Sequence, residues 1–362
     1  MKRFLPLLFL LTVFTSGIRT DALLPQHFEL NQLLVVNAVG IDIDEAGDFK
    51  VTLAYTQETE AGGVSLLNAT GRSFSAAIFH ASSYAGRSVF LGHTRLVILG
   101  REAAKRGLTE ITDYVTRSYE TSLSANVMTA EGQAADLLGA SPFGSSDLLS
   151  ELDTLLESLK VNSLSSPVTL AELAADAFCK TRFSVTPLVR TVQNETGSLN
   201  VMVGSAVYRD GKLFTAFTDD GALMLTVLRN KAQSHIFDVN TASAGRLSLR
   251  ITSFQTKTNF REENGKIHAA ISLDLRAAVI ESSSGNLDDA ATKEVVEHVQ
   301  TGIKEQAVAF LSALGENDLC SFGDILRRFY PRLYRRWDQT DAFSYEVETS
   351  CLLENSFIHG GG

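Results

Sequence analysis

The stretch RLSLRITSFQTKTNFREENGKIHAAISLDLRAAVIE, residues 246–281, predicts the fold of the second half of the chain. It contains two long runs in which apolar and polar residues alternate, a pattern typical of strands with one buried face. Asn264 and Gly265 separate the runs, and an Asn-Gly pair at such a point is a strong signal for a two-residue hairpin turn. The stretch therefore predicts two long antiparallel strands.

Other elements of the second half follow from the same kind of pattern. Asp210 and Gly211 separate two apolar runs and predict another hairpin. The remaining expected elements are a short helix at 219–230, a long helix at 288–314, a short helix at 322–330 and a strand at 343–353. In the long helix, the residues expected to be buried are Val295, Val296, Val299, Ile303, Val308, Phe310, Leu311 and Leu314.

The first half alternates between strand and helix patterns. Residues 33–41 and 50–57 predict a hairpin around the acidic turn at Gly47, and residues 58–71 predict a loop. The further expected elements are helices at 72–86, 108–115, 131–139 and 148–159, strands at 89–99, 122–130 and 183–192, and a helix that begins at the capping box of Thr169 and Glu172. Helices between and beside antiparallel strands predict a multi-domain α+β protein with mixed sheets.

The composition of the chain and its turn-rich stretches suggest how it is divided into domains. Residues 1–22 are expected to be an export signal, 23–193 an N-terminal region of two subdomains, and 198–362 a C-terminal domain. The boundary is placed in the polar, turn-rich stretch QNETGSLN, residues 193–200. The net charge of −10 argues against general nucleic-acid binding.

The N-terminus has the three parts of an export signal: Lys2 and Arg3, an apolar run at 4–14, and small residues. A buried N-terminal helix is the alternative. The run is too short for a membrane-spanning helix, which needs about 20 residues. Ile18 stands where a lipoprotein signal has the cysteine that receives the lipid. We therefore expect an exported, unlipidated mature chain cleaved near Gly17 or Ala22.

The three cysteines, Cys179, Cys320 and Cys351, are too few and too widely spaced for a disulfide scaffold. They fit small buried apolar residues, or one disulfide with a free thiol. The sequence contains no Cys-x-x-Cys pair, so it offers no support for a structural zinc site.

Two local patterns are candidates for chemistry. His93 and Arg95 share the expected strand at 89–99, and they could hold an anion or act in acid–base catalysis. The alternative is a structural role, in which alanine at His93 loses a buried hydrogen bond and costs about 1–3 kcal/mol. Glu294 and His298 share a helix face, but the metalloprotease pattern His-Glu-x-x-His is absent. We predict no catalytic, cofactor-binding or metal-binding residue.

A basic, aromatic segment is a candidate docking surface. Its arginines are Arg327, Arg328, Arg332, Arg335 and Arg336, and its aromatic residues are Phe329, Tyr330, Tyr334 and Trp337. Pro331 divides it into two short helical pieces. Two interpretations are open: a surface that meets anionic lipid headgroups or an acidic partner, or solvated arginines whose aromatic neighbours belong to the core.

Three stretches together resemble the Ger(x)C family of spore germination proteins, and the resemblance runs from about Leu30 to Phe357. The stretches are ELNQLLVVNAVGIDIDEAGDFKVTL (29–53), GRSFSAAIFHASSYAGRSVFLGHTRLVILGREAAKRGL (71–108) and FGDILRRFYPRLYRRWDQ (322–339). Gly92, His93 and Arg95 fall on a motif of the family. The chain departs from the family at Ile18, where the lipid-bearing cysteine is missing.

The resemblance implies a non-catalytic C subunit of a nutrient germinant receptor, with a three-domain arrangement and no cofactor. Such subunits are lipoproteins on the outer face of the spore's inner membrane. Their partners are a transporter-like, multi-spanning subunit and a second membrane subunit; a membrane surface is one of the two interpretations of the arginine-rich segment, apart from the resemblance. The alternatives are a secreted or cell-envelope scaffold that retains the fold, and a secreted enzyme with a site around His93.

Overall fold

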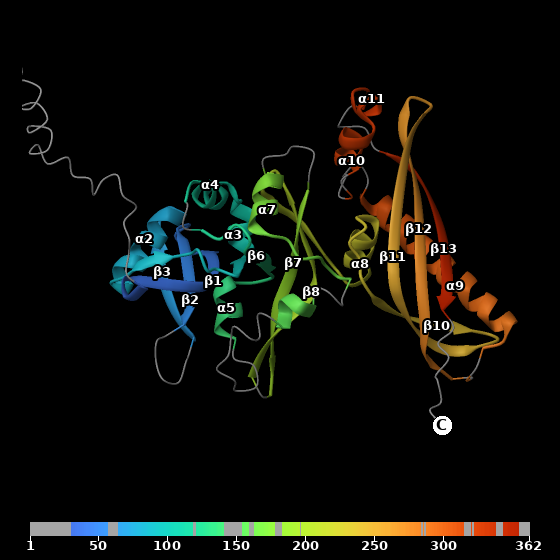
Figure 1. Cartoon of the computed structure of the whole chain (residues 1–362), viewed down its shortest axis with the longest axis horizontal. Helices are drawn as coiled ribbons and strands as arrows, with labels where there is room; N and C mark the ends of the chain where they lie inside the picture. The colour runs from blue at the N-terminus through green and yellow to red at the C-terminus, as the bar shows by residue number, and fades with distance from the viewer. Residues whose placement is uncertain are drawn as a thin grey trace, which may run out of the picture.

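The structure is a computed structural model of the whole chain, and it has two sheets with their helices side by side (Figure 1). It describes residues 30–56, 64–118, 121–140, 154–158, 163–177, 183–195, 197–283, 285, 287–314, 320, 322–337 and 343–354. The predicted export signal at 1–22, with Ile18, lies outside these ranges, as does Cys179. Among the described residues, no helix is long and apolar enough to cross a membrane.

Strands from the first 218 residues form one large mixed sheet. Its order is β3 (Val64–Gly71), β2 (Phe49–Thr56), β1 (Leu33–Ile43), β5 (Leu96–Leu99), β6 (Asn126–Ala130), β7 (Ser184–Asn194), β8 (Gly197–Arg209) and β9 (Lys212–Thr218), with β4 (Ser88–Phe90) beside the start of β1. The centre, β1-β5-β6-β7, is parallel, whereas both ends of the sheet are antiparallel. The predicted hairpin at 33–57 is therefore confirmed as β1 and β2.

Helices cover both faces of this sheet. One face carries α2 (Phe74–Ala85), α3 (Arg101–Arg106), α4 (Thr109–Arg117) and α7 (Leu170–Ala177). The opposite face carries α5 (Ala134–Gly139). A short 3-10 helix, η2 (Leu30–Gln32), precedes β1. A central parallel sheet covered on both faces explains why β1, β5 and β6 are almost continuously apolar.

The second sheet is built around the long hairpin that the sequence predicts. Its order is β10 (His235–Thr241), β11 (Gly245–Glu263), β12 (Lys266–Ser282) and β13 (Ser344–Glu354). Asn264 and Gly265 have φ values of 51° and 77°, as a type I′ turn requires, so the predicted turn is confirmed. β13 pairs with β12 in parallel, which returns the chain's last strand to the hairpin.

Helices of the second half pack on this sheet and join it to the first. They are α8 (Asp219–Leu228), α9 (Asp289–Leu314), α10 (Phe322–Phe329) and α11 (Pro331–Tyr334). The core residues of α9 contact those of β11 and β12 in one cluster. Phe217 of β9 meets Phe310 of α9 with ring centroids 5.2 Å apart, so the two sheets share an apolar contact. In α9, Val308 is 37% exposed rather than buried, and Val296 is half-buried.

Two other sequence predictions are wrong. The predicted loop at 58–71 contains strand β3 at 64–71, and the predicted strand at 89–99 is two strands, β4 and β5, with a turn between them. β3 is an edge strand whose sequence, VSLLNATG, follows two glycines and does not alternate regularly between apolar and polar residues, so its pattern resembles that of a loop. The turn lets β4 and β5 pair in parallel with successive parts of β1, β4 with Leu33–Val35 and β5 with Ala38–Ile41.

The predicted domain boundary at 193–200 coincides with the turn between β7 and β8. Both strands belong to the first sheet and pair through Asn194 and Gly197. Polar turn residues mark a tight hairpin as readily as a linker, so composition does not distinguish the two. The domain limits at 193 and 198 stay a prediction, whereas the change from one sheet to the other comes after β9, at α8.

Candidate docking surface

The basic segment forms two short helices at one corner of the second sheet. α10 ends at Phe329, and Pro331 occupies the first position of α11. Proline has no N–H to donate and disfavours the helical conformation in the residue before it. Tyr330 accordingly has φ −128° and ψ 57°, outside the helical region. The break redirects the chain, so that both helices lie over the end of the β11–β12 hairpin (Figure 1).

An aromatic cluster holds these helices on the sheet. Phe260 of β11 is 6% exposed, and its ring lies 5.7 Å from that of Phe322 and 5.5 Å from that of Tyr330. Phe343 closes the cluster, 6.0 Å from Phe260 and 5.1 Å from Trp337. The edge-to-face arrangements in the cluster are favourable for aromatic pairs. These aromatic side chains therefore pack against the core, as expected if the aromatic residues of the segment are structural.

Three of the five arginines form ion pairs on the surface. Asp324 binds both Arg327 and Arg328, with N···O distances of 2.9 and 2.8 Å. Arg336 binds Glu262 of β11 at 2.8 Å. Arg332 and Arg335 are exposed and have no ion pair within the described part of the chain. Within this segment, the arginines without an ion pair to a described residue therefore lie in α11 and at its C-cap, Arg335.

Phe329 differs from the other aromatic residues of the segment. Its side chain is 73% exposed, the largest exposure among the large apolar side chains that the structure describes. It ends α10, next to Arg328 and three residues before Arg332 of α11. The surface formed by Arg327, Arg328, Phe329, Arg332, Arg335 and Arg336 is called the docking surface below. It combines exposed guanidinium groups with one exposed aromatic ring, as a surface-binding site requires.

His93 and Arg95 lie in the turn between β4 and β5, where both side chains are exposed. His93 contacts the ring of Phe90 at 5.6 Å in an edge-on arrangement. The buried polar residue of the turn is Thr94, whose Oγ1 donates to the carbonyl of Val36 at 3.3 Å. The prediction that His93 makes a buried hydrogen bond within a strand is therefore wrong.

We expect alanine at His93 to change the free energy of unfolding by less than about 0.5 kcal/mol, because an exposed side chain loses little on truncation. The matched control is alanine at Thr94 in the same turn, which should cost about 1 kcal/mol through its buried hydrogen bond. Thermal unfolding of the two variants checks the order. A larger loss at His93 than at Thr94 would show that His93 stabilises the turn.

Glu294 and His298 do not form a metal site with a third ligand: the described residues contain no group of three or more metal-ligating side chains. Glu294 instead accepts hydrogen bonds from the backbone N–H groups of Ala242 and Ser243, at 3.1 and 3.0 Å, and from the Ser243 hydroxyl. The Ser243 hydroxyl is the main reason that the pKa of Glu294 lies below its usual value. This carboxylate therefore fixes α9 to the β10–β11 turn.

A polar cleft that the sequence does not reveal lies at the carboxyl ends of the parallel strands. α3 follows β5 on one face of the sheet and α5 follows β6 on the other, and a crevice opens where neighbouring connections separate in this way. The cleft measures about 390 Å³ and is lined by Arg101, Glu131 and Arg190, among others. Arg190 donates to Glu131 through Nη2 at 2.8 Å and through Nε, which holds the pKa of Glu131 below its usual value.

Beside this cleft, Asp42 of β1 is a buried carboxylate with a structural partner. Its Oδ1 accepts from the N–H of Ala134 at 2.8 Å, and its Oδ2 from that of Ala135 at 3.0 Å. Burial raises the pKa of Asp42, and the two hydrogen bonds oppose that shift. The N–H groups of the first turn of α5 are thus paired with a carboxyl group of the protein itself. This group occupies the position where the N-terminus of a helix could hold a bound anion.

Comparison with known proteins gives matches along both halves of the chain. Residues 26–191 match a family model described as the spore germination protein N-terminal domain, and residues 203–355 match one described as spore germination B3/GerAC like, C-terminal. The residues between the two matches, 192–202, include the stretch 193–200. Each half of the chain therefore resembles spore germination proteins independently of the other.

Individual relatives are distant. The putative spore germination protein YfkR of Bacillus subtilis (strain 168) is 23% identical over 203 residues, 55% of this chain and 52% of YfkR. The matched part of the chain thus spans about half the length of that relative. The crystal structure of the GerBC protein has a TM-score of 0.60 at 15% identity and covers 88% of this chain and 97% of its own. The two chains share a fold over most of their length.

Proposed function

The chain belongs to the Ger(x)C family of spore germination proteins, and we propose that it acts as the C subunit of a nutrient germinant receptor. The observation that carries this proposal is the pair of family matches, in sequence order, over residues 26–191 and 203–355. A scaffold that no longer took part in a receptor would be under no constraint to keep both halves of the family's sequence. The α+β fold shared with the GerBC protein supports the same assignment.

In this role the chain contributes by assembly rather than by catalysis. Its proposed partners are a transporter-like, multi-spanning subunit and a second membrane subunit, on the outer face of the spore's inner membrane. The exposed position of His93 and Arg95, in a turn rather than a pocket, supports a role in which no reaction takes place at these residues. The charged cleft at Arg101, Glu131 and Arg190 is a second surface available for assembly.

Purification of the tagged full chain from spore membranes tests the proposal. We expect two membrane subunits to be recovered with it, and deletion of its gene to slow the response of spores to nutrients. A tagged exported protein of unrelated fold serves as the control for non-specific recovery. Recovery of the chain without either subunit, together with normal germination of the deletion strain, would contradict the receptor role. Expression outside sporulation would then favour a cell-envelope scaffold.

A further inference from the structure

We propose that the docking surface binds the surface of an anionic lipid bilayer, with the arginines of α11 among the headgroups and Phe329 at the boundary with the acyl chains. This inference goes beyond the proposed function, since it concerns the chain's own affinity for lipid and needs no receptor subunit. It rests on charge, exposure and position, each of which belongs to the described residues.

Charge is the first argument. The chain carries a net charge of −10, yet five of its basic residues fall within the ten positions 327–336. After the ion pairs with Asp324 and Glu262, Arg332 and Arg335 have no ion pair among the residues that the structure describes. An anionic bilayer repels the molecule as a whole and attracts this corner. The docking surface therefore also sets the orientation in which the chain approaches a membrane.

Exposure of an apolar side chain beside these charges is the second argument. Phe329 is 73% exposed, although Tyr330, Tyr334 and Trp337 of the same segment pack against the core. Phenylalanine beside basic residues is the composition of helices that lie in the membrane interface. A protein partner would have to supply both acidic groups for the arginines and an apolar pocket for the ring, whereas the interface of an anionic bilayer offers both along its whole surface, which favours lipid.

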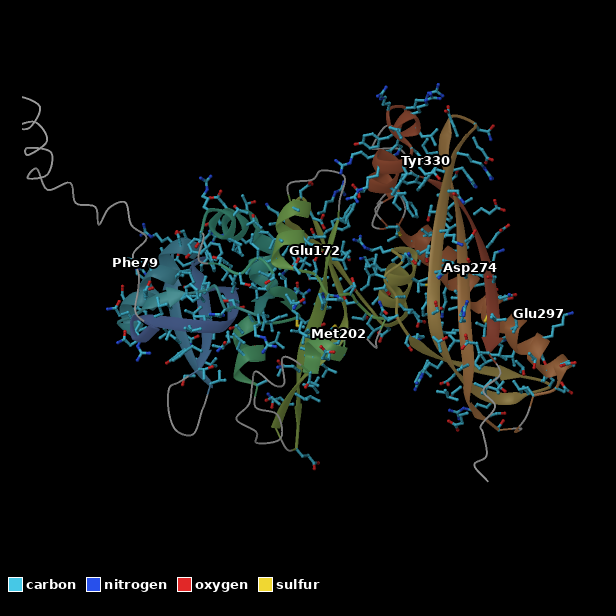
Figure 2. All side chains as sticks on the ribbon, in the orientation of Figure 1. Phe79, Glu172, Met202, Asp274, Glu297 and Tyr330 are labelled. Carbon is cyan, nitrogen blue, oxygen red and sulfur yellow. The ribbon has the colours of Figure 1, made fainter. Side chains whose placement is uncertain are left out.

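Position is the third argument. α10, α11 and the end of the β11–β12 hairpin lie together at one extremity of the molecule (Figure 1). Figure 2 shows Tyr330 at the upper edge of the second half of the molecule, and Phe79 at the far left end of the first. The three arguments concern independent properties, and each points to the same residues.

Vesicle flotation of the full chain is the test. The vesicles are phosphatidylcholine with about one third phosphatidylglycerol, compared with phosphatidylcholine alone, at low salt. We expect binding to the anionic vesicles only. The variant Arg332→Gln/Arg335→Gln should bind about 25-fold more weakly, because each basic residue near an anionic surface contributes about fivefold.

Matched variants show whether a loss of vesicle binding is specific to the docking surface or follows from any loss of charge or of an apolar side chain. Arg246→Gln/Arg250→Gln removes the same charge from exposed positions of β11 and should bind like the unchanged chain. Phe329→Ser should weaken binding several-fold, whereas Phe79→Ser, at a 69% exposed ring on α2, should not. Circular dichroism confirms that each variant is folded.

Several outcomes would overturn the proposal. They are equal binding to neutral vesicles, equal loss in the two arginine variants, and equal loss in the two phenylalanine variants. If the chain ignores vesicles but is retained by immobilised polyglutamate in an Arg332- and Arg335-dependent way, the surface belongs to an acidic protein. None of these outcomes bears on the receptor role, which co-purification tests separately.

Discussion

Alanine at Gly100 is expected to lower the free energy of unfolding by about 3 kcal/mol, the upper part of the range for overpacking a filled interior. Gly100 follows β5 and is the N-cap of α3, with φ −63° and ψ 155°, values that alanine adopts without strain. The added Cβ would overlap Oδ1 of Asp42 and lie 3.2 Å from the N–H nitrogen of Ala134. The effect is therefore steric and not conformational.

Asp42 makes this overlap costly. Its side chain is 4% exposed and is the acceptor for the first two N–H groups of α5. If it moves away from a methyl group at position 100, these N–H groups lose their partner within the protein interior, and a buried unsatisfied donor costs about 1–3 kcal/mol. If it stays, β5 and β1 must separate.

Urea unfolding of the two glycine variants Gly100→Ala and Gly132→Ala measures the effect. Gly132 borders the same cleft, and a Cβ added there meets no atom within 4 Å, so its variant should be within about 0.5 kcal/mol of the unchanged chain. Similar stabilities for the two variants would show that Asp42 accommodates a side chain at position 100, and that its hydrogen bonds to α5 contribute little.

Local signals in the sequence predict those elements whose conformation is decided by neighbouring residues. Asn264–Gly265 and Asp210–Gly211 specify their turns by themselves, because their positive φ values suit few other residues. The capping box is confirmed in the same way: Thr169 and Glu172 bond to each other's backbone N–H groups, at 2.8 and 3.3 Å. Such features need no information about the rest of the fold.

Elements that depend on distant partners were predicted less well. β3 and β10 are edge strands whose exposed positions mix polar residues with one large apolar residue each, Leu66 and Ile236, so neither strand has a clear apolar face to detect. The turn at His93 exists because β4 and β5 each pair with β1, more than 50 residues earlier in the chain. A run that is apolar at both ends reads as one strand unless that pairing is known.

The docking surface shows the same difference between features set by neighbouring residues and features that depend on distant ones. The cluster of arginines and the break at Pro331 follow from the sequence, because they are local. Which arginines are neutralised does not, since Arg336 pairs with Glu262, 74 residues away. The cleft was missed because Glu131 and Arg190, 59 residues apart, meet only where helices depart to opposite faces of the sheet. Composition cannot reveal on which face a helix packs.

The aromatic cluster links the stability of the second sheet to the docking surface, and alanine at Phe260 is the change that tests this link. Phe260 is 6% exposed and touches the rings of Phe322, Tyr330 and Phe343. Truncation of a buried phenylalanine to alanine costs about 3–5 kcal/mol through lost burial and the cavity left behind. We expect a loss of that size, measured by urea unfolding, with α10 and α11 released from the sheet before the sheet itself unfolds.

Limited trypsin digestion distinguishes local release from global unfolding, since the docking surface supplies the cleavage sites. In the Phe260→Ala variant we expect early cuts at Arg327, Arg328, Arg332 and Arg335, while the β11–β12 hairpin and the first sheet stay protected. Alanine at Phe214, a ring of β9 that is 44% exposed, is the matched control and should leave the digestion pattern unchanged. Cleavage spread evenly over the chain would mean that α10 and α11 unfold only together with the second sheet. The arginines would then be held in place by the whole domain rather than by the ring of Phe260.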